Sequence, residues 1–358
     1  MKIREGKISI LSLLIVTSIT ILLMILELNS RTKVEAKYYK EKLQAAEVTQ
    51  NAFTAIKSAV EEMGIPIDRI NDPNETGLIG LQYSPITTER GDLDFKLTST
   101  NPNFAALIVE LLKRGGAKQG DVVAFSLTGS YPAINIGALS AAQVLGLKPI
   151  IITSVSSSMW GANFPEFTYL DIESLLERKG ILSSKTTAAS IGGEDDIGRG
   201  LSPAGREVIE QAALRNNVPL LDASNLDGII DKKMEIYDSA GRIKIFVNVG
   251  EKTTALVGSE VTTGLVRPHA VRTGRGTIAQ FSSKGIPVIN LIDMDELAET
   301  YSIPTAPIPL PDPGEGRLYY EYKYSVTFAL IATVILVVIL FIVLRFDVDY
   351  YLKRRKND

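Results

Sequence analysis

Two long apolar runs, one near each end, stand out in the pattern of hydrophobic and polar positions. Ile8 to Leu26 and Ser325 to Leu344 contain no charged residue. Each run has about 20 residues, and a helix of that length at about 1.5 Å per residue crosses the hydrocarbon core of a bilayer. A cleaved signal peptide is the rival interpretation of the first run, but the run is long and no small-residue cleavage pattern follows it. The pattern predicts one transmembrane helix near each end.

Between these runs, short apolar stretches alternate with amphipathic ones. The segment Gly120 to Val155 reads as a strand (Val122 to Leu127), a polar turn, a helix (Ala133 to Leu145) and a second strand (Pro149 to Val155). Such a βαβ unit places its strands parallel in one sheet. Further strands are predicted at Leu78 to Tyr83, Thr187 to Ile191, Val218 to Leu221, Ile243 to Val249 and Val288 to Ile292. With helices between them, these strands predict an α/β domain with a doubly wound, mostly parallel, Rossmann-like sheet.

The same pattern predicts the organisation of the whole chain. We expect a cytoplasmic tip and transmembrane helix at 1–28, an amphipathic stalk helix at 29–66, the extracytoplasmic α/β domain at 67–302, a Pro-rich linker at 303–324, the second transmembrane helix at 325–345 and a basic cytoplasmic tail at 346–358. The amphipathic helix has two interpretations, because its apolar stripe fits either a stalk or a face packed on the domain.

Charges beside the apolar runs predict their orientation. Lys2, Arg4 and Lys7 precede the first run, and Arg345 and the cluster 353–356 follow the second. Basic residues favour the cytoplasmic side, so both termini are predicted to be cytoplasmic and the domain between them extracytoplasmic. A smaller basic group after the first run, at positions 31, 33 and 37, argues the other way.

Composition excludes several functions. The formal net charge is −3, and no basic patch interleaved with aromatic residues suggests nucleic acid. The chain has no cysteine and a single histidine, His269, which excludes thiolate catalysis and centres built from cysteines or several histidines. Neither a P-loop nor a dinucleotide fingerprint occurs in its proper context. We therefore predict no cofactor and no metal.

Polar residues follow the first strand of the βαβ unit. Thr128, Gly129 and Ser130 form the turn, and Ser130 is expected to cap the helix that has Pro132 in its first turn. Free N–H groups at a helix start attract an anion or carboxylate. Asn135 is a further candidate ligand residue, with local capping as its alternative role.

Two other strand ends carry similar residues. The second strand is followed by Ser156, Ser157, Ser158 and Trp160. The strand that ends at Val249 carries Asn248 near its end and is followed by Glu251, Lys252 and Thr253. Ligands of parallel α/β sheets bind in the crevice outside the carboxyl ends of the strands. If these strands are neighbours, the three groups form one ligand site.

A second cluster contains Arg267, His269 and Arg272 among glycines. Guanidinium groups bind carboxylates and phosphates bidentately, which makes this loop a candidate anion site. A solvated loop without a ligand is the alternative.

Two chemical alternatives concern catalysis and metal binding. A serine hydrolase would use Ser130 or Ser157 with His269 as base, although the Gly-x-Ser-x-Gly pattern is absent. The run Glu194 to Asp196 could hold a divalent cation, but acidic turns are common and too few ligands are spaced to surround an ion.

The chain also resembles a known family. The resemblance is carried by the stretches ITTERGDLDFKLTSTNPNFAALIVELL, GSYPAINIGALSAA and SSSMWGANFPEFTYLDIE, with an apolar run at each end of the chain. These are similar to the poly-γ-glutamate system protein family, whose members accompany the synthase of this capsule polymer in bacteria. The resemblance implies a protein of the bacterial cell membrane that takes part in synthesis, export or anchoring of poly-γ-glutamate. It carries over no catalytic residues.

Three functional hypotheses follow. The first is a membrane-anchored accessory protein that binds the anionic polymer or its synthase outside the membrane. The second is a serine-dependent hydrolase or transferase acting on γ-glutamyl amide bonds. The third is a sensor of a small anion. Whether the protein is an enzyme is left open at this point.

Overall fold

The computed structural model describes residues 8, 10–250 and 254–346, and these form two compact units. One unit combines the two ends of the chain, up to Ala36 and from Tyr320 onwards. The other runs from Lys37 to Tyr319 and contains the sheet.

The first unit contains the two apolar helices. They are α1 (Ile10–Asn29) and α11 (Val326–Arg345), with mean hydropathies of 2.5 and 3.2, and each is long and apolar enough to cross a membrane. Apolar helices thus lie near each end where transmembrane helices were predicted, with bounds shifted by a few residues. Beside them, β1 (Thr32–Glu35) pairs with β12 (Tyr320–Lys323) as an antiparallel ribbon.

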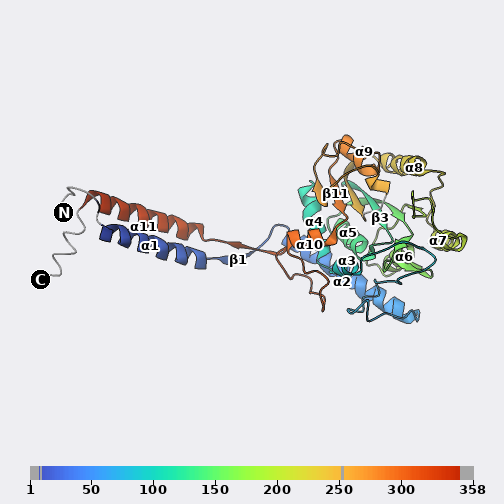
Figure 1. Ribbon diagram of the computed structural model, residues 1–358, viewed down its shortest axis with the longest axis horizontal. Helices are drawn as coiled ribbons and strands as arrows, with labels where there is room; N and C mark the ends of the chain where they lie inside the picture. The colour runs from blue at the N-terminus through green and yellow to red at the C-terminus, as the bar shows by residue number, and fades with distance from the viewer. Residues whose placement is uncertain (1–7, 9, 251–253, 347–358) are drawn as a thin grey trace. The chain divides into compact units, whose positions relative to one another are not determined.

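A six-stranded sheet forms the centre of the second unit (Figure 1). Its order is β10 (Gly264–Val266), β11 (Val288–Leu291), β9 (Ile243–Val249), β3 (Val122–Thr128), β4 (Lys148–Ser154) and β8 (Ala188–Ser190). All neighbours are parallel except β10, which is antiparallel to β11. The predicted mostly parallel sheet is confirmed.

Two strand predictions differ from the structure, and one strand of the sheet was not predicted. Leu78 to Tyr83 contains no strand, and Val218 to Leu221 contributes only one bridge, from Leu220 to Ala189. The antiparallel strand β10 was not predicted, because three residues are too few to show a hydrophobic period.

Helices cover both faces of the sheet. The connection from β3 to β4 is α5 (Pro132–Val144), which lies on one face, while α8 (Leu226–Ser239) and α9 (Thr277–Ser283) lie on the other (Figure 1). The core on the α8 and α9 side includes Ala124, Phe246 and Phe281, and the rings of the two phenylalanines stack at 4.5 Å. The chain thus leaves the neighbouring strands β3 and β9 toward opposite faces.

Two further helices extend the layer that contains α5. These are α2 (Tyr39–Glu62) and α4 (Phe104–Arg114), and both pack on α5. Lys42 of α2 is 3% exposed, and its Nζ lies 2.9 Å from both Glu110 Oε2 and the Leu318 carbonyl oxygen. Of the two interpretations of this amphipathic helix, the structure therefore shows the packed face.

The Pro-rich segment also lies on the domain. Asn74 and Asn103 donate side-chain hydrogen bonds to the carbonyl oxygens of Pro307 and Asp312, at 2.8 and 3.1 Å. The boundary between the units consequently falls after Tyr319. The remaining elements are β2 (Thr87–Glu89), α3 (Leu93–Ser99), β5 (Ser157–Ser158), β6 (Asn163–Phe164), β7 (Phe167–Thr168), α6 (Tyr169–Arg178), α7 (Pro203–Arg215), the 3-10 helix η1 (Thr254–Leu256) and α10 (Met294–Tyr301).

Candidate functional site

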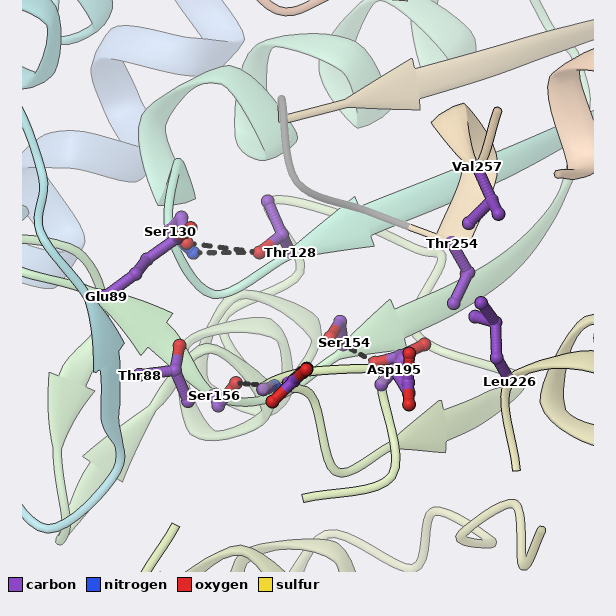
Figure 2. A pocket seen from close by; sticks show the side chains of 13 residues that line it. Thr88, Glu89, Thr128, Ser130, Ser154, Ser156, Asp195, Leu226, Thr254 and Val257 are labelled. Atoms are coloured by element: carbon purple, nitrogen blue, oxygen red, sulfur yellow. Dashed lines mark hydrogen bonds between the residues drawn. The ribbon is translucent and has the colours of Figure 1, made fainter. Parts of the chain in front are cut away.

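Two cavities lie at the carboxyl edge of the parallel strands, and we call them together the cleft. Their volumes are about 360 and 250 Å³, and they share Glu89, Thr128 and Ser130 as lining residues. The larger cavity is also lined by Ser154, Ser156, Glu194, Asp195, Leu226 and Thr254 (Figure 2). The smaller one adds Arg90, Asp92, Phe95, Tyr131, Ser158 and Gly250.

The turn after β3 is held by its own side chains. Thr128 Oγ1 accepts the Ser130 amide at 3.2 Å, and Asn135 Nδ2 donates to the Thr128 carbonyl at 2.7 Å. Pro132 opens α5 as expected, but the residue before the helix is Tyr131 and no side chain caps it. The prediction that Ser130 caps α5 is wrong, because its hydroxyl turns toward the next strand end instead.

The Ser130 hydroxyl joins two strand ends. Its Oγ accepts the backbone N–H of Ser158 at 3.0 Å and the hydroxyl of Thr128 at 3.3 Å. Ser130 is 8% exposed. Within the described part of the chain, the Ser130 hydroxyl donates its own proton to no acceptor. Ser130 therefore presents a hydrogen-bond donor to the cleft.

A buried lysine stands behind these serines. Lys96 of α3 is 1% exposed, and its Nζ donates to Ser158 Oγ at 2.7 Å and to the Ser130 carbonyl. It also lies 3.7 Å from the centre of the Tyr131 ring. The sequence analysis missed Lys96, and its only signal there was a lysine placed between the apolar residues Phe95 and Leu97.

The serines after β4 have different roles. Ser156 and Ser158 line the two cavities, whereas Ser157 is fully buried and donates to the Gly129 carbonyl at 3.2 Å. Trp160 lines neither cavity, and its indole N–H is buried without a partner among the described residues. The predicted cluster is therefore brought together in part, by Thr128, Ser130, Ser156 and Ser158.

An acidic loop closes the larger cavity. Asp196 accepts hydrogen bonds from Ser154 at 2.6 Å and Ser190 at 2.8 Å, and it forms a buried ion pair with Lys233. Asp195 pairs with Arg199 at 2.6 Å. In the described residues, no group of three or more acidic or histidine side chains is arranged to hold a metal ion.

The backbone of this loop is strained where it meets the serines. Asp195 and Asp196 have φ angles of 59° and 61°, which residues with a Cβ rarely adopt. The Gly193 amide donates to Ser156 Oγ at 2.9 Å. A Cβ on Gly192 would lie 2.0 Å from the same oxygen, so the close approach requires glycine. The acidic residues were noted from the sequence, but the contacts of this loop were not: Asp196 with Ser154, and the Gly193 amide with Ser156.

The end of β9 forms another wall. Asn248 is fully buried and donates to the side chain of Asn290 at 2.9 Å and to the Gly250 carbonyl at 3.1 Å. Asn248 thus supports the wall and lines neither cavity, while Gly250 and Thr254 do line them. The predicted candidates Glu251, Lys252 and Thr253 lie outside the described residues.

The arginine loop lies elsewhere. Because β10 is antiparallel to β11, the chain leaves β10 beside the start of β11, at the edge of the sheet opposite the cleft. Arg267, His269 and Arg272 are exposed there and line neither cavity. The His269 ring lies against Gly285, just before β11. His269 is therefore not placed to act as a base for Ser130 or Ser157.

The charges of the cleft are uneven. Among the residues that the structure describes, the charged side chains lining the larger cavity are acidic, namely Glu89, Glu194, Asp195 and Asp196. Arg199 pairs with Asp195, and Lys233 pairs with Asp196. Lys96 supplies positive charge behind the smaller cavity. This arrangement suits a ligand that carries both a cationic and an anionic group.

Comparison of the chain with protein-family models, with curated proteins and with solved structures gives no match.

Proposed function

We propose that this protein is a membrane-anchored accessory protein of poly-γ-glutamate synthesis or export in bacteria, and that its domain binds the polymer or its synthase. The observation that carries the proposal is where the three resembling stretches lie. The first supplies Glu89 and Lys96, the second Ser130, and the third Ser156 and Ser158, so each contributes to the cleft or its supports. Loops at a cavity carry ligand chemistry more often than the packed elements behind them, so these residues support a binding role.

The fold supports a ligand-binding role. We interpret the domain as a doubly wound, Rossmann-like sheet, because the order of the parallel strands runs outward in both directions from β3. In such sheets the ligand crevice opens where neighbouring strands send their connections to opposite faces. Here that position lies between β3 and β9, whose carboxyl ends border the cleft.

The proposed topology places the domain outside the cell with both termini in the cytoplasm. Pairing of β1 with β12 brings together the inner ends of α1 and α11, which favours a helical hairpin with both termini on one side. The chain has no cysteine, so Ser224→Cys, at an exposed position, creates a single thiol. A membrane-impermeant maleimide is expected to label it in intact cells. Labelling only after permeabilisation would reject the external domain.

Polymer binding is tested by retention of the detergent-solubilised full chain on immobilised poly-γ-glutamate. The structure separates two possible contact surfaces, since Ser130 lies in the cleft and Arg272 on the opposite edge. We expect Ser130→Ala to lower retention. Loss with Arg272→Ala alone, together with strong weakening by salt, would identify the arginine loop as the contact. Failure of the wild-type chain to bind either polymer or synthase would reject the proposal.

A second function, hydrolysis or transfer of γ-glutamyl amide bonds, is favoured by one contact. Ser158 Oγ lies 2.7 Å from Lys96 Nζ, within reach for a serine nucleophile and a lysine base. Oγ would bond to the amide carbon as its proton passes to an unprotonated Nζ. The C–N bond would then break, with the proton moving to the leaving nitrogen. Water or an amine would attack the resulting acyl-serine ester and free the Ser158 hydroxyl.

This second function predicts cleavage or transfer of labelled γ-glutamyl oligomers by the full chain. Ser158→Ala is expected to abolish it, whereas Ser157→Ala is a matched control because Ser157 lines neither cavity. Intact oligomers after prolonged incubation with the wild-type protein would eliminate the catalytic alternative.

A further inference from the structure

Two buried serine hydroxyls in the cleft have protons to donate. Ser130 and Ser158 are 8% and 4% exposed, and both line the smaller cavity. Ser130 Oγ accepts two hydrogen bonds and Ser158 Oγ accepts one from Lys96, yet neither hydroxyl donates to an acceptor in the part of the chain that the structure describes. A buried donor without an acceptor is costly, so these hydroxyls favour a ligand with paired acceptor oxygens. A carboxylate has that geometry, and the positive charge of Lys96 behind Ser158 strengthens a hydrogen bond from Ser158 to such an anion.

An acidic side chain lies beside the same hydroxyls. In the parallel pairing of β2 with β5, Glu89 is the partner of Ser158. Glu89 and Ser130 line both cavities and lie at the same end of the larger one (Figure 2). A carboxylate accepts several hydrogen bonds, so Glu89 can receive an ammonium group placed next to the ligand carboxylate.

From this juxtaposition we infer that the cleft recognises an ammonium and a carboxylate carried on one carbon, the head group of an α-amino acid. The inference rests on the proposed function and names the part of the polymer that is bound. A γ-linkage consumes the side-chain carboxyl group, so interior units keep only the α-carboxylate. The amino-terminal unit alone keeps both the α-ammonium and the α-carboxylate. The cleft therefore binds the amino-terminal end of a γ-glutamyl chain in preference to its interior.

The rest of the larger cavity supports this preference. Glu194 and Asp195 add negative charge there, and a chain of further carboxylates threaded through it would be repelled. Arg90, on the side of the smaller cavity, offers the opposite charge. A single head group at Ser130 and Glu89, with the remaining chain leaving past Arg90, places the ammonium beside a carboxylate and the further carboxylates beside a guanidinium group.

The test compares two probes by calorimetry on the full chain in detergent: a γ-linked glutamate trimer with a free amino end, and the same trimer N-acetylated. We expect acetylation to weaken binding about tenfold or more, as for loss of a charged hydrogen bond. Equal binding of the two trimers would overturn the inference and leave polymer binding intact. No binding of either trimer or of the polymer would instead contradict the proposed function.

Variants assign the effect to residues. Glu89→Gln is expected to reduce the discrimination between the two trimers to about twofold or less, while Ser130→Ala weakens both. Glu210→Gln is the matched control, because Glu210 is exposed on α7 and lines neither cavity. Discrimination that survives Glu89→Gln in a folded protein would reject Glu89 as the ammonium partner.

Discussion

The backbone N–H of Ser158 donates to Ser130 Oγ at 3.0 Å, and this bond joins the turn after β3 to the strand that follows β4. Two segments that are distant in sequence therefore share one hydroxyl at the cleft. The Ser130 oxygen accepts hydrogen bonds from the protein, which is a structural role. Its proton is available to a ligand.

Ser130→Ala is expected to destabilise the domain as well as weaken ligand binding. It leaves the buried Ser158 N–H without its acceptor, which costs about 1–3 kcal/mol of unfolding free energy. Urea unfolding followed by the fluorescence of Trp160, the only tryptophan, measures this change. Ser283→Ala is the control, because that exposed hydroxyl bonds only a carbonyl three residues earlier. Equal losses for the two variants would contradict the structural role of Ser130.

The ion pair of Lys233 and Asp196 is expected to be sensitive to removal of one partner. Both side chains are nearly fully buried, so Lys233→Met leaves an uncompensated carboxylate and is expected to cost about 3–5 kcal/mol. Adding Asp196→Asn should recover part of this loss. Lys284→Met, which breaks an exposed pair with Asp238, should cost about 0–1 kcal/mol in the same urea titration. A buried-pair loss no larger than the exposed one would refute this expectation.

Gly192→Ala is expected to displace Ser156 from the cleft. The added Cβ would lie 2.0 Å from Ser156 Oγ, and the φ of 88° is also unfavourable for alanine. Gly200→Ala separates these effects, because Gly200 has a φ of 86° in the same loop but open space around it. Both variants are thus expected to suffer comparable backbone strain. Ligand affinity is expected to fall chiefly in Gly192→Ala. Similar affinities in both would show that Ser156 does not contact the ligand.

Glu173 gives the domain a predictable dependence on pH. Burial raises the pKa of this carboxyl to about 7, and the hydrogen bond from the Thr186 amide opposes the rise only in part. The unfolded carboxyl titrates near 4.3, so the folded state binds more protons between these values. Protonation of Glu173 therefore contributes on the order of 3 kcal/mol to the free energy of unfolding. This contribution is complete below about pH 4 and is lost as the pH rises through 7.

Glu173→Gln tests this dependence, because it keeps an acceptor for Thr186 and removes the titration. Between about pH 5 and pH 8 the wild-type protein is expected to lose unfolding free energy that the variant keeps. Parallel curves for the two proteins in urea titrations at each pH would rule out Glu173 as the source.

Strong periodic signals made much of the fold predictable. The strands of the βαβ unit and Ile243 to Val249 appear where the apolar runs placed them, since a strand buried on both faces leaves a continuous apolar run. The helix predicted at Ala133 to Leu145 is α5, which runs from Pro132 to Val144. Elements of two to four residues, such as β2 and β5, leave no such pattern, yet their pairing sets Glu89 opposite Ser158.

The site was harder to predict than the sheet. Thr128 and Ser130 could be placed because they follow a parallel strand, whose carboxyl end borders the crevice. Placement of Arg267 and His269 depended on β10, which reverses the chain and opens their loop at the opposite edge. Lys96 was missed because nothing local distinguishes a buried lysine from a solvated one; its neighbours, Ser158 and Ser130, come from distant segments.

The contacts of Lys42 bear on how the domain carries load. Its ammonium group fastens the start of α2 to the Leu318 carbonyl, so the first and last parts of the domain are tied together. A pull on the two ends of the domain would therefore act on this buried contact, which lies between α2 and residue 318 and not in the sheet.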